Sequence, residues 1–261
     1  MIDTLKAART IAAARRTLTP LPPLDAECAP QDLLDAYRIQ EALHSELASD
    51  FGAVVGYKIG CTSAVMQKYL SIAHPCAGGI FAKRVHQSGV SLPASGFVRV
   101  GVECEIAVRL GRDLEYTGTP FTEDDVADAI EAYFPAIELV DDRYVKWETL
   151  GAPTLIADDF FGAAIVLGKP VSRSKASDLR KVVGRAVING AEVGRGTGAD
   201  LMGHPHNPVA WLANHLAAQG KKLRADQTVM TGSSVQTVWL RAGDKVEMEF
   251  TELGSVHLEF T

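Results

Sequence analysis

The stretch at residues 101–110, GVECEIAVRL, decides how the fold of this chain is interpreted. Its β-branched and other apolar residues predict a buried strand, yet Glu103 and Glu105 stand two positions apart within it. Residues two apart on a strand point to the same side of the sheet, so both carboxylates share one face. At a separation of ~5 Å and an effective dielectric of ~20, two carboxylates repel by roughly 3 kcal/mol. Either open solvent or a bound cation must offset this repulsion.

A third carboxylate, Glu138, lies in the apolar segment PAIELV. An unpaired carboxylate in such surroundings is costly, or it takes up a proton. One interpretation pairs Glu138 with Arg143 or Lys146 in a salt bridge. In the other, Glu138 converges with Glu103 and Glu105 on a hard divalent cation. Three carboxylate ligands would leave about three of the six octahedral positions of Mg²⁺ open for a small acid and a water.

Lys58, in VVGYKIG, is a candidate partner for such a site. In one interpretation its side chain simply extends along apolar surface to solvent. In the other, its ammonium lies near an anionic substrate, where it can bind a carboxylate or transfer a proton. A half-open metal site with a lysine beside it suits Lewis-acid chemistry on a small acid.

The composition of the 261 residues is that of an ordinary globular protein, with 47% hydrophobic and 22% charged residues. A net charge of -6 gives no general attraction for nucleic acid or anionic membranes, so neither is expected as a partner. No apolar run approaches the ~20 residues that span a bilayer. The cysteines include no CxxC pair and predict a reduced, cytoplasmic compartment: Cys28, Cys61, Cys76 and Cys104.

The chain is predicted to form a single catalytic domain, residues 1–261, that begins with a helical segment. Helical periodicity of apolar residues covers residues 1–52 and stops at a glycine. We also expect a helix that begins after the N-cap Thr122 and ends at Pro135. A further helix is expected in NPVAWLANHLAAQG, ending at Gly220.

The rest of the second half has the pattern of short strands. An Asn189-Gly190 pair predicts a hairpin, and GDKVEMEF and GSVHLEF alternate apolar with polar residues. Strands from distant parts of the chain with few helices between them predict an α+β fold with mixed, largely antiparallel sheets. The histidines of HPH at residues 204–206 are interpreted as part of a loop, without a second metal site. Asp158 and Asp159 either line a pocket or cap a loop.

Several segments match a known family in the same order over nearly the whole chain. On these segments the chain resembles the 2-keto-4-pentenoate (2-hydroxypenta-2,4-dienoate) hydratase family. That family stands beside the 4-oxalocrotonate decarboxylases in the fumarylacetoacetate hydrolase superfamily. The matching segments are AYRIQ (36–40), GYKIGCTSAVMQ (56–67), GVECEIAVRLGRDL (101–114), AIELVDDR (136–143), NPVAWLANHLAAQG (207–220) and LGSVHLEF (253–260).

The resemblance implies the superfamily's β-rich roll with peripheral helices. It also implies that Mg²⁺ or Mn²⁺ is held by Glu103, Glu105 and Glu138. Lys58 would be the active-site lysine, and Ser233, in TGSS, would lie near the substrate. The substrates would be 2-hydroxy-2,4-dienoates or their 2-oxo tautomers from aromatic ring cleavage, to which a hydratase adds water. The working form would be a homo-oligomer or a complex with a related decarboxylase.

Two positions depart from the family pattern. Cys76 stands where the hydratases usually have an acidic residue, and Phe160 or Phe161 stands where they often have a serine. Both belong to the part of the site that would position water or move protons, so Cys76 and Phe160 are candidate substrate contacts. His74 is a candidate replacement base. The alternatives to a hydratase are a 4-oxalocrotonate-type decarboxylase, an acylpyruvate hydrolase and a non-catalytic partner subunit.

Overall fold

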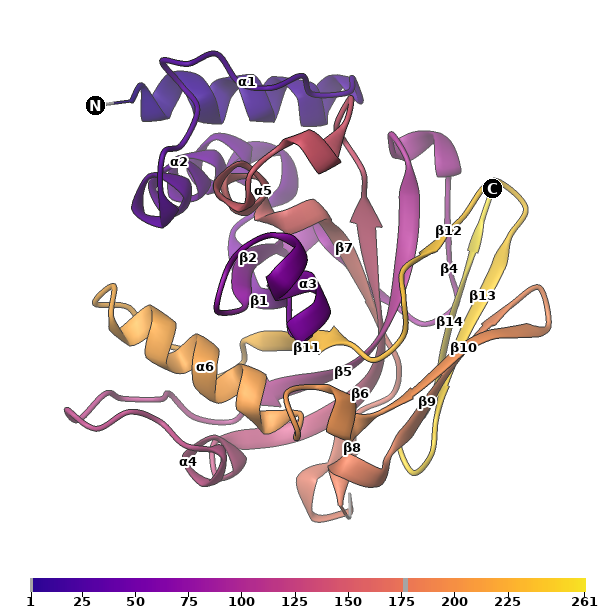
Figure 1. Ribbon diagram of the computed structural model, residues 1–261. Coiled ribbons are helices and arrows are strands. Elements are labelled where there is room, and N and C mark those ends of the chain that lie inside the picture. The colour runs from indigo at the N-terminus through magenta and orange to yellow at the C-terminus, as the bar shows by residue number, and fades with distance from the viewer. Residues whose placement is uncertain (1, 176–177) are drawn as a thin grey trace.

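The computed structural model describes residues 2–175 and 178–261, and two β-sheets form its body (Figure 1). The larger sheet has the spatial order β2 (Cys76–Phe81), β1 (Val54–Gly60), β11 (Thr228–Ser233), β5 (Val100–Leu110), β6 (Ile130–Asp141), β7 (Gly162–Leu167) and β3 (Val85–Gln87), with β12 (Val238–Trp239) beside β5 and β8 (Val171–Ser172) beside β6. The smaller sheet has the order β10 (Ala191–Thr197), β9 (Val183–Ile188), β13 (Lys245–Phe250), β14 (Gly254–Phe260) and β4 (Val90–Leu92).

Most neighbouring strands are antiparallel, and the parallel pairs are β1 with β11, β3 with β7 and β14 with β4. The described helices are α1 (Thr4–Thr17), α2 (Leu33–Phe51), α3 (Ala64–Tyr69), α4 (Glu123–Ala127), α5 (Ala152–Ala157) and α6 (His206–Ala217). None of these helices combines the length and the apolar character needed to cross a membrane. The predicted α+β class, with mixed sheets and peripheral helices, is confirmed.

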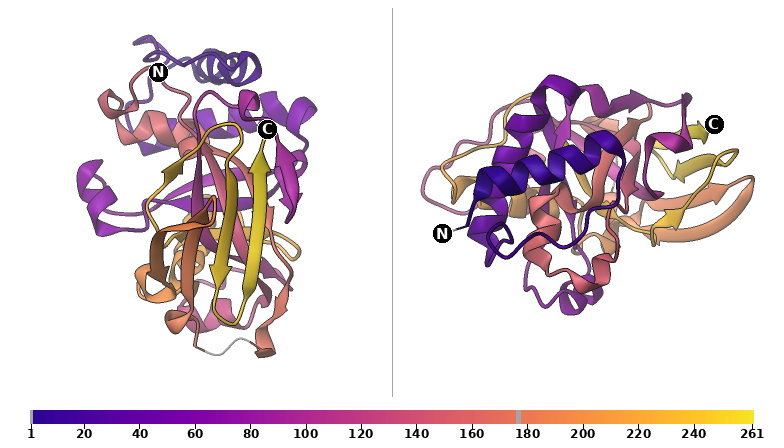
Figure 2. Two further views of the ribbon diagram at one scale, coloured as in Figure 1. Left: turned by 90° about the vertical axis from the view of Figure 1, so that its right-hand side faces the viewer. Right: turned by 90° about the horizontal axis from the view of Figure 1, so that it is seen from above.

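The predicted N-terminal helical segment consists of α1 and α2. The carboxylates of Asp3 and Asp32 cap the two helices by accepting backbone N–H groups of their first turns. Gly52, with a φ of 83°, ends α2 as expected. Both helices lie at one end of the molecule, far from α4 (Figure 1), and Figure 2 shows the same end from two further sides. They pack with α5 into one apolar cluster.

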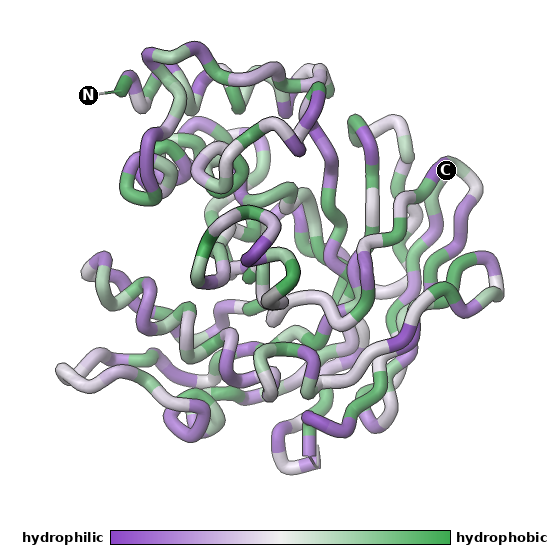
Figure 3. The backbone as a smooth tube through the Cα atoms, in the orientation of Figure 1, coloured by the Kyte–Doolittle hydropathy of each residue, from purple (hydrophilic) through white to green (hydrophobic). Residues whose placement is uncertain are grey.

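The main core lies between the two sheets and extends under α6. Val246, Met248 and Phe250 of β13 are buried and alternate with charged residues, as the sequence pattern predicts. Figure 3 shows this alternating hydropathy along the strands of the smaller sheet. Asn189 and Gly190 have φ values of 53° and 82°, and they form the predicted turn between β9 and β10.

The predicted helix up to Pro135 is wrong beyond its first turn. Thr122 does begin a helix and forms a capping box with Asp125, but α4 ends at residue 127. The residues that follow belong to β6. Pro135 fits there because β8 pairs with β6 up to Tyr133, while β7 begins to pair with it at Ala136. On this side of β6, Pro135 lies between the end of the pairing with β8 and the start of the pairing with β7, so a residue without an N–H is tolerated there.

Candidate metal and substrate site

The register of β5 against β6 brings the three predicted carboxylates together. Glu103 lies directly opposite Glu138 in this antiparallel pair, and Glu105 follows on the same face of β5. One carboxylate oxygen from each residue lies within 4.8 Å of the other two. Glu105 and Glu138 are each 1% exposed, whereas Glu103 is partly exposed. The three acidic groups therefore form one largely buried cluster that reaches solvent at Glu103.

Hydrogen bonds from the protein leave part of this cluster unpartnered. The backbone N–H of Gly232 donates to Glu105 Oε2 at 2.8 Å, and Thr237 Oγ1 donates to Glu103 Oε1 at 2.5 Å. Within residues 2–175 and 178–261, no donor reaches Glu105 Oε1 or Glu138 Oε2, and both atoms are buried. Buried oxygens without partners are costly, and carboxylate oxygens are the donors that Mg²⁺ and Mn²⁺ prefer. The donor set therefore fits a hard divalent cation.

Lys58 of β1 is the cationic neighbour of the cluster. Its side chain is buried, so the interpretation in which it extends to solvent is wrong. Lys58 Nζ lies 3.1 Å from Glu138 Oε1 and donates a hydrogen bond to the carbonyl oxygen of Phe160 at 3.0 Å. The salt bridge considered for Glu138 thus forms with Lys58 and not with Arg143, whose guanidinium binds Asp158.

Burial and mutual repulsion shift the pKa values of the cluster. Burial, and then the charges of Glu138 and Glu103, raise the pKa of Glu105 well above its usual value. Burial raises the pKa of Glu138 to about 7, although Lys58 opposes this shift. Burial would lower the pKa of Lys58, but the attraction of the three carboxylates outweighs it and raises the pKa. The arrangement gathers more negative charge than one lysine balances, which favours an added cation.

A strained backbone segment places Phe160 against Lys58. Asp159, Phe160 and Phe161 have consecutive positive φ values of 54°, 48° and 67°, which non-glycine residues rarely adopt. This conformation turns the Phe160 carbonyl toward the ammonium and holds the ring centroid 5.5 Å from Nζ. The candidate substrate contact Phe160 therefore lies beside Lys58.

Buried ion pairs beneath this segment hold it in place. Arg15 of α1 lies 2.6 Å from Asp158 Oδ1 and 3.1 Å from Asp159 Oδ2. His44 Nε2 lies 2.6 Å from Asp159 Oδ1, which also accepts the N–H of Gly79 at 2.8 Å. Burial acts to raise the pKa of Asp159, but these partners lower it below its usual value. The two aspartates thus anchor the strained segment to the N-terminal helices.

Cys76 lies beside the site as a packed thiol. It is the first residue of β2, pairs with Gly60, and is 0% exposed. A hydrogen bond with Cys61, together with burial, raises the pKa of the Cys76 thiol. A neutral, buried thiol is a poor acid–base group, so its position favours a packing role.

Two other candidates, Ser233 and His74, form hydrogen bonds with backbone groups. Ser233 lies opposite Glu105 in the pairing of β11 with β5. Its hydroxyl donates to the carbonyl of Val235 at 2.6 Å and accepts the N–H of Cys104 at 3.2 Å, so it stabilises the turn after β11. His74 Nδ1 bonds to the adjacent carbonyl at 2.7 Å, and its ring stacks on Trp211. The structure does not bring His74 to the cluster.

Four residues that shape the site were not predicted: Arg15, His44, Gly232 and Thr237. Arg15 had a detectable signal, because it follows Ala8 and Ile11 at helical spacing on the apolar face of α1. A glycine inside a strand pattern, such as Gly232, also signals a bulge or a close backbone approach. His44 and Thr237 carry no comparable signal in the sequence.

Replacing Gly232 by alanine is expected to disturb the cluster. Gly232 has a φ of 102°, and an added Cβ would lie 2.5 Å from Thr62 Oγ1. We expect a loss of more than ~1 kcal/mol in the free energy of unfolding and weaker Mg²⁺ binding, because the N–H to Glu105 must move. Gly190→Ala is the control, since Gly190 has a φ of 82° but open space around it. Equal losses in both variants, by urea unfolding, would show that only backbone strain matters at Gly232.

The chain is similar to known proteins over most of its length. Residues 79–261 match the family model described as fumarylacetoacetate (FAA) hydrolase C-terminal. The chain is 34% identical over 253 residues to a 2-keto-4-pentenoate hydratase of Burkholderia vietnamiensis, and the match covers 97% of this chain and 94% of that protein. It is 33% identical over 252 residues to a 2-hydroxyhexa-2,4-dienoate hydratase of Comamonas testosteroni, covering 94% of this chain and 92% of that protein.

Two solved structures are similar to this chain in fold. The 4-oxalocrotonate decarboxylase from Pseudomonas putida G7, complexed with magnesium and adipate, matches with a TM-score of 0.92 and 27% identity, covering 99% of this chain and 97% of that chain. A fumarylpyruvate hydrolase from Pseudomonas aeruginosa, in complex with Mn²⁺ and pyruvate, shares the fold with a TM-score of 0.60 at 15% identity, covering 78% of this chain and 88% of that chain. The matched family model and the full-length relatives above 30% identity together show that this chain belongs to the fumarylacetoacetate hydrolase family.

Proposed function

We propose that this chain is a metal-dependent hydratase that adds water to 2-hydroxy-2,4-dienoates or their 2-oxo-4-enoate tautomers. The observation that carries the proposal is the cluster of Glu103, Glu105 and Glu138, with two buried oxygens that accept no hydrogen bond within the described chain. The buried ammonium of Lys58 lies beside it. Relatives named as hydratases of such acids, at 33% and 34% identity, support this choice of reaction.

Glu103, Glu105 and Glu138 would hold the cation, and Mg²⁺ or Mn²⁺ suits their oxygen donors. When bound, the cation supplies Lewis-acid stabilisation of negative charge on the 2-oxygen of the substrate. Three protein carboxylates would leave about three of six positions for the substrate and water. Glu103 is the partly exposed member, so substrate and water would enter from its side.

Lys58 would interact with the carboxylate end of the substrate. Its ammonium can bind that carboxylate or hold a proton near the 2-oxygen. The carbonyl of Phe160 accepts one hydrogen bond from Nζ and so limits where the remaining N–H groups point. The Phe160 ring, with its centroid 5.5 Å from Nζ, presents an apolar surface to Lys58 and would help to exclude bulk water from the reacting atoms.

The test follows the loss of dienoate absorbance when the purified chain is mixed with 2-hydroxypenta-2,4-dienoate. We expect turnover with Mg²⁺ or Mn²⁺, its loss with a chelator, and its return when the metal is restored. Metal binding by calorimetry without turnover of the dienoate or of 4-oxalocrotonate would contradict the proposal and favour a non-catalytic partner subunit.

Decarboxylation is the second candidate. It is supported by the TM-score of 0.92 to the 4-oxalocrotonate decarboxylase and by the departure at Phe160 or Phe161 from the serine that the hydratases often have. When bound, the cation would also stabilise the negative charge that develops on the 2-oxygen as carbon dioxide is lost. Release of carbon dioxide from 4-oxalocrotonate, faster than hydration of the dienoate, would establish this candidate over the first.

Lys58→Met is expected to lower turnover without weakening metal binding. Loss of the ammonium should lower kcat by ~10²–10³-fold, the range for removing one donor that stabilises developing charge. Mg²⁺ should bind as tightly or more tightly, because the ammonium 3.1 Å from Glu138 Oε1 no longer repels it. Lys245→Met, on the exposed start of β13, is the control. Weaker Mg²⁺ binding with an unchanged kcat would refute this role.

We also propose that the chain works in the cytoplasm as a homo-oligomer, alone or together with a related decarboxylase. The small organic acids named for its relatives are metabolites of the kind that cytoplasmic enzymes handle. Light scattering of the purified chain would measure the oligomer, and a monomer at micromolar concentration would contradict this part.

A further inference from the structure

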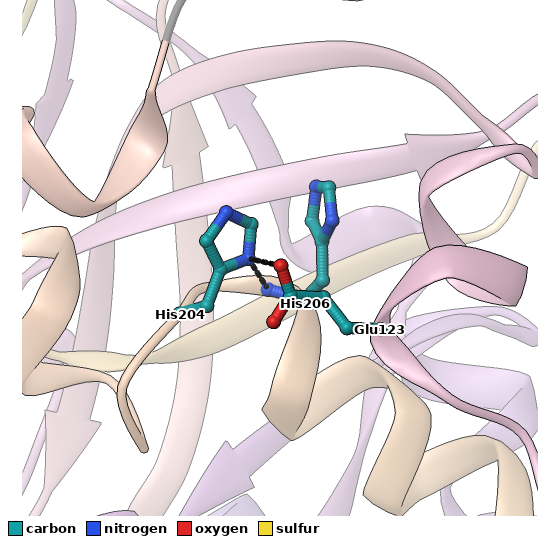
Figure 4. A group of neighbouring side chains, drawn as sticks. All are labelled: Glu123, His204 and His206. Atoms are coloured by element: carbon teal, nitrogen blue, oxygen red, sulfur yellow. Dashed lines mark hydrogen bonds and ion pairs between the residues drawn. The ribbon is translucent and has the colours of Figure 1, made fainter.

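A second group of metal-ligating side chains lies at the opposite end of β6 from Glu138. Glu123 of α4 and the two histidines of the HPH segment, His204 and His206, each offer a ligand atom within 4.8 Å of the others (Figure 4). Tyr133 of β6, which contacts this group, precedes Glu138 by five residues, or ~17 Å along a strand. The group is therefore separate from the carboxylate cluster.

The hydrogen bonds of His204 leave two electron-rich atoms facing each other. His204 Nδ1 accepts the backbone N–H of His206 at 3.1 Å, so this nitrogen carries a lone pair. The same atom lies 3.4 Å from Glu123 Oε1, an acceptor of the opposite side chain. Figure 4 shows both contacts converging on this nitrogen. A cation between them satisfies both.

His206 is the most buried member of the group and is oriented by a hydrogen bond. Its side chain is 6% exposed, and its Nε2 lies 2.9 Å from the hydroxyl of Tyr133. Ligating histidines in metal sites usually bond their second nitrogen to a neighbouring group, which fixes the ring and the lone pair. Here the hydroxyl of Tyr133 is the neighbouring group of His206.

We propose that Glu123, His204 and His206 form a second metal site, for Zn²⁺ or a similar transition ion. Two imidazole nitrogens and one carboxylate suit Zn²⁺ well, whereas Mg²⁺ prefers oxygen donors. The sequence analysis expected no metal at HPH, but in the structure the two histidines that flank Pro205, the N-cap of α6, have ring centroids 4.4 Å apart.

The bound ion would join α4 to α6 and, through the contact of His206 with Tyr133, to β6. Glu123 begins α4, His206 begins α6, and His206 bonds to Tyr133 of β6. Binding requires His204 Nδ1 to share or give up its bond with the His206 N–H. Glu123, whose side chain is 44% exposed, has room to adjust toward the ion.

The experiment uses the full chain, freed of metal and then saturated with Mg²⁺ so that the carboxylate cluster is occupied. Calorimetric titration with Zn²⁺ should give one further ion per chain and a rise in Tm of several degrees. Co²⁺ in place of Zn²⁺ should give visible absorption bands of a low-coordinate site. His204→Gln, His206→Gln and Glu123→Gln should each weaken Zn²⁺ binding by at least ~10-fold.

Two controls keep the result interpretable. His215→Gln removes a histidine in the separate stack with Trp211 and should leave Zn²⁺ binding unchanged. Glu123→Gln changes a partly exposed residue, so it tests the site even if a buried histidine variant fails to fold. The proposal is overturned if no Zn²⁺ binds beyond the amount that displaces bound Mg²⁺. It is also overturned if the His215 variant weakens Zn²⁺ binding and the three ligand variants do not.

Discussion

Replacing Glu105 by glutamine is expected to abolish metal-dependent turnover, with a fall in kcat of at least ~100-fold, the upper range for losing even a supporting neighbour of a metal ligand. The fold should survive the change. The glutamine oxygen can still accept the N–H of Gly232, which now bonds to Glu105 Oε2 at 2.8 Å. Removing one of three adjacent carboxylates also relieves a repulsion of roughly 3 kcal/mol per pair at ~5 Å.

Thermal unfolding with and without Mg²⁺ tests both halves of this expectation. In the absence of metal, Glu105→Gln should have a Tm equal to or above that of the unmodified chain. Added Mg²⁺ should raise the Tm of the unmodified chain but not that of the variant, since only a ligand that binds the native state stabilises it. Glu259→Gln, an exposed glutamate of β14, is the matched control and should behave like the unmodified chain. Unfolding of Glu105→Gln in the absence of metal would show that Glu105 is structural.

Arg15→Met is expected to destabilise the chain by ~3–5 kcal/mol, because breaking a buried ion pair leaves uncompensated charge. The side chain of Arg15 is 7% exposed and lies within 3.1 Å of carboxylate oxygens of both Asp158 and Asp159. A typical domain is stable by only ~5–15 kcal/mol, so this is a large share of the total. Because Asp159 begins the strained segment that carries Phe160, kcat should fall as well.

Arg16→Met is the natural control for this prediction. Arg16 is the next residue on α1 and also forms an ion pair, with Asp50, but both side chains are 39% exposed. Exposed pairs contribute about 0–1 kcal/mol. Urea unfolding should therefore show a loss several times larger for Arg15 than for Arg16. Equal losses would mean that the buried network does not anchor the N-terminal helices.

The features that sequence could predict are those set by local rules. The common face of Glu103 and Glu105 follows from the two-residue period of a strand, and the structure has it. The Asn189-Gly190 turn follows from its requirement for positive φ. The pairing of Glu103 with Glu138 does not follow from spacing, because strand register depends on contacts along both strands. From the residues alone, the convergence of Glu138 with the other two is one of two interpretations, and the resemblance to a family favours it.

The wrong helix before Pro135 has a physical cause. Val126, Ile130 and Tyr133 fit a helical period, and acidic residues after Thr122 do start a helix. The following strand, β6, is buried on both faces apart from residue 131, so it shows no alternation of apolar and polar residues. A strand of this kind cannot be distinguished from a buried helix by periodicity alone.

The contacts that complete the site are set by tertiary structure. Arg15 meets Asp158 across 143 residues, and Lys58 meets the Phe160 carbonyl across 102 residues. The positive φ values of the Phe160 segment are imposed by the buried network beneath it, since its residue types do not favour them. Such pairs depend on how distant elements pack, and no local pattern in the sequence encodes them.

Anomalous diffraction from crystals of the chain grown with Mn²⁺ and oxalate would show whether the three carboxylates bind a cation. One strong peak is expected within ~2.0–2.6 Å, the range for hard divalent cations, of an oxygen from each of Glu103, Glu105 and Glu138. Oxalate should complete the coordination on the side of Glu103. Carboxylates that lie apart or turn outward to solvent, with no anomalous peak between them, would contradict this expectation.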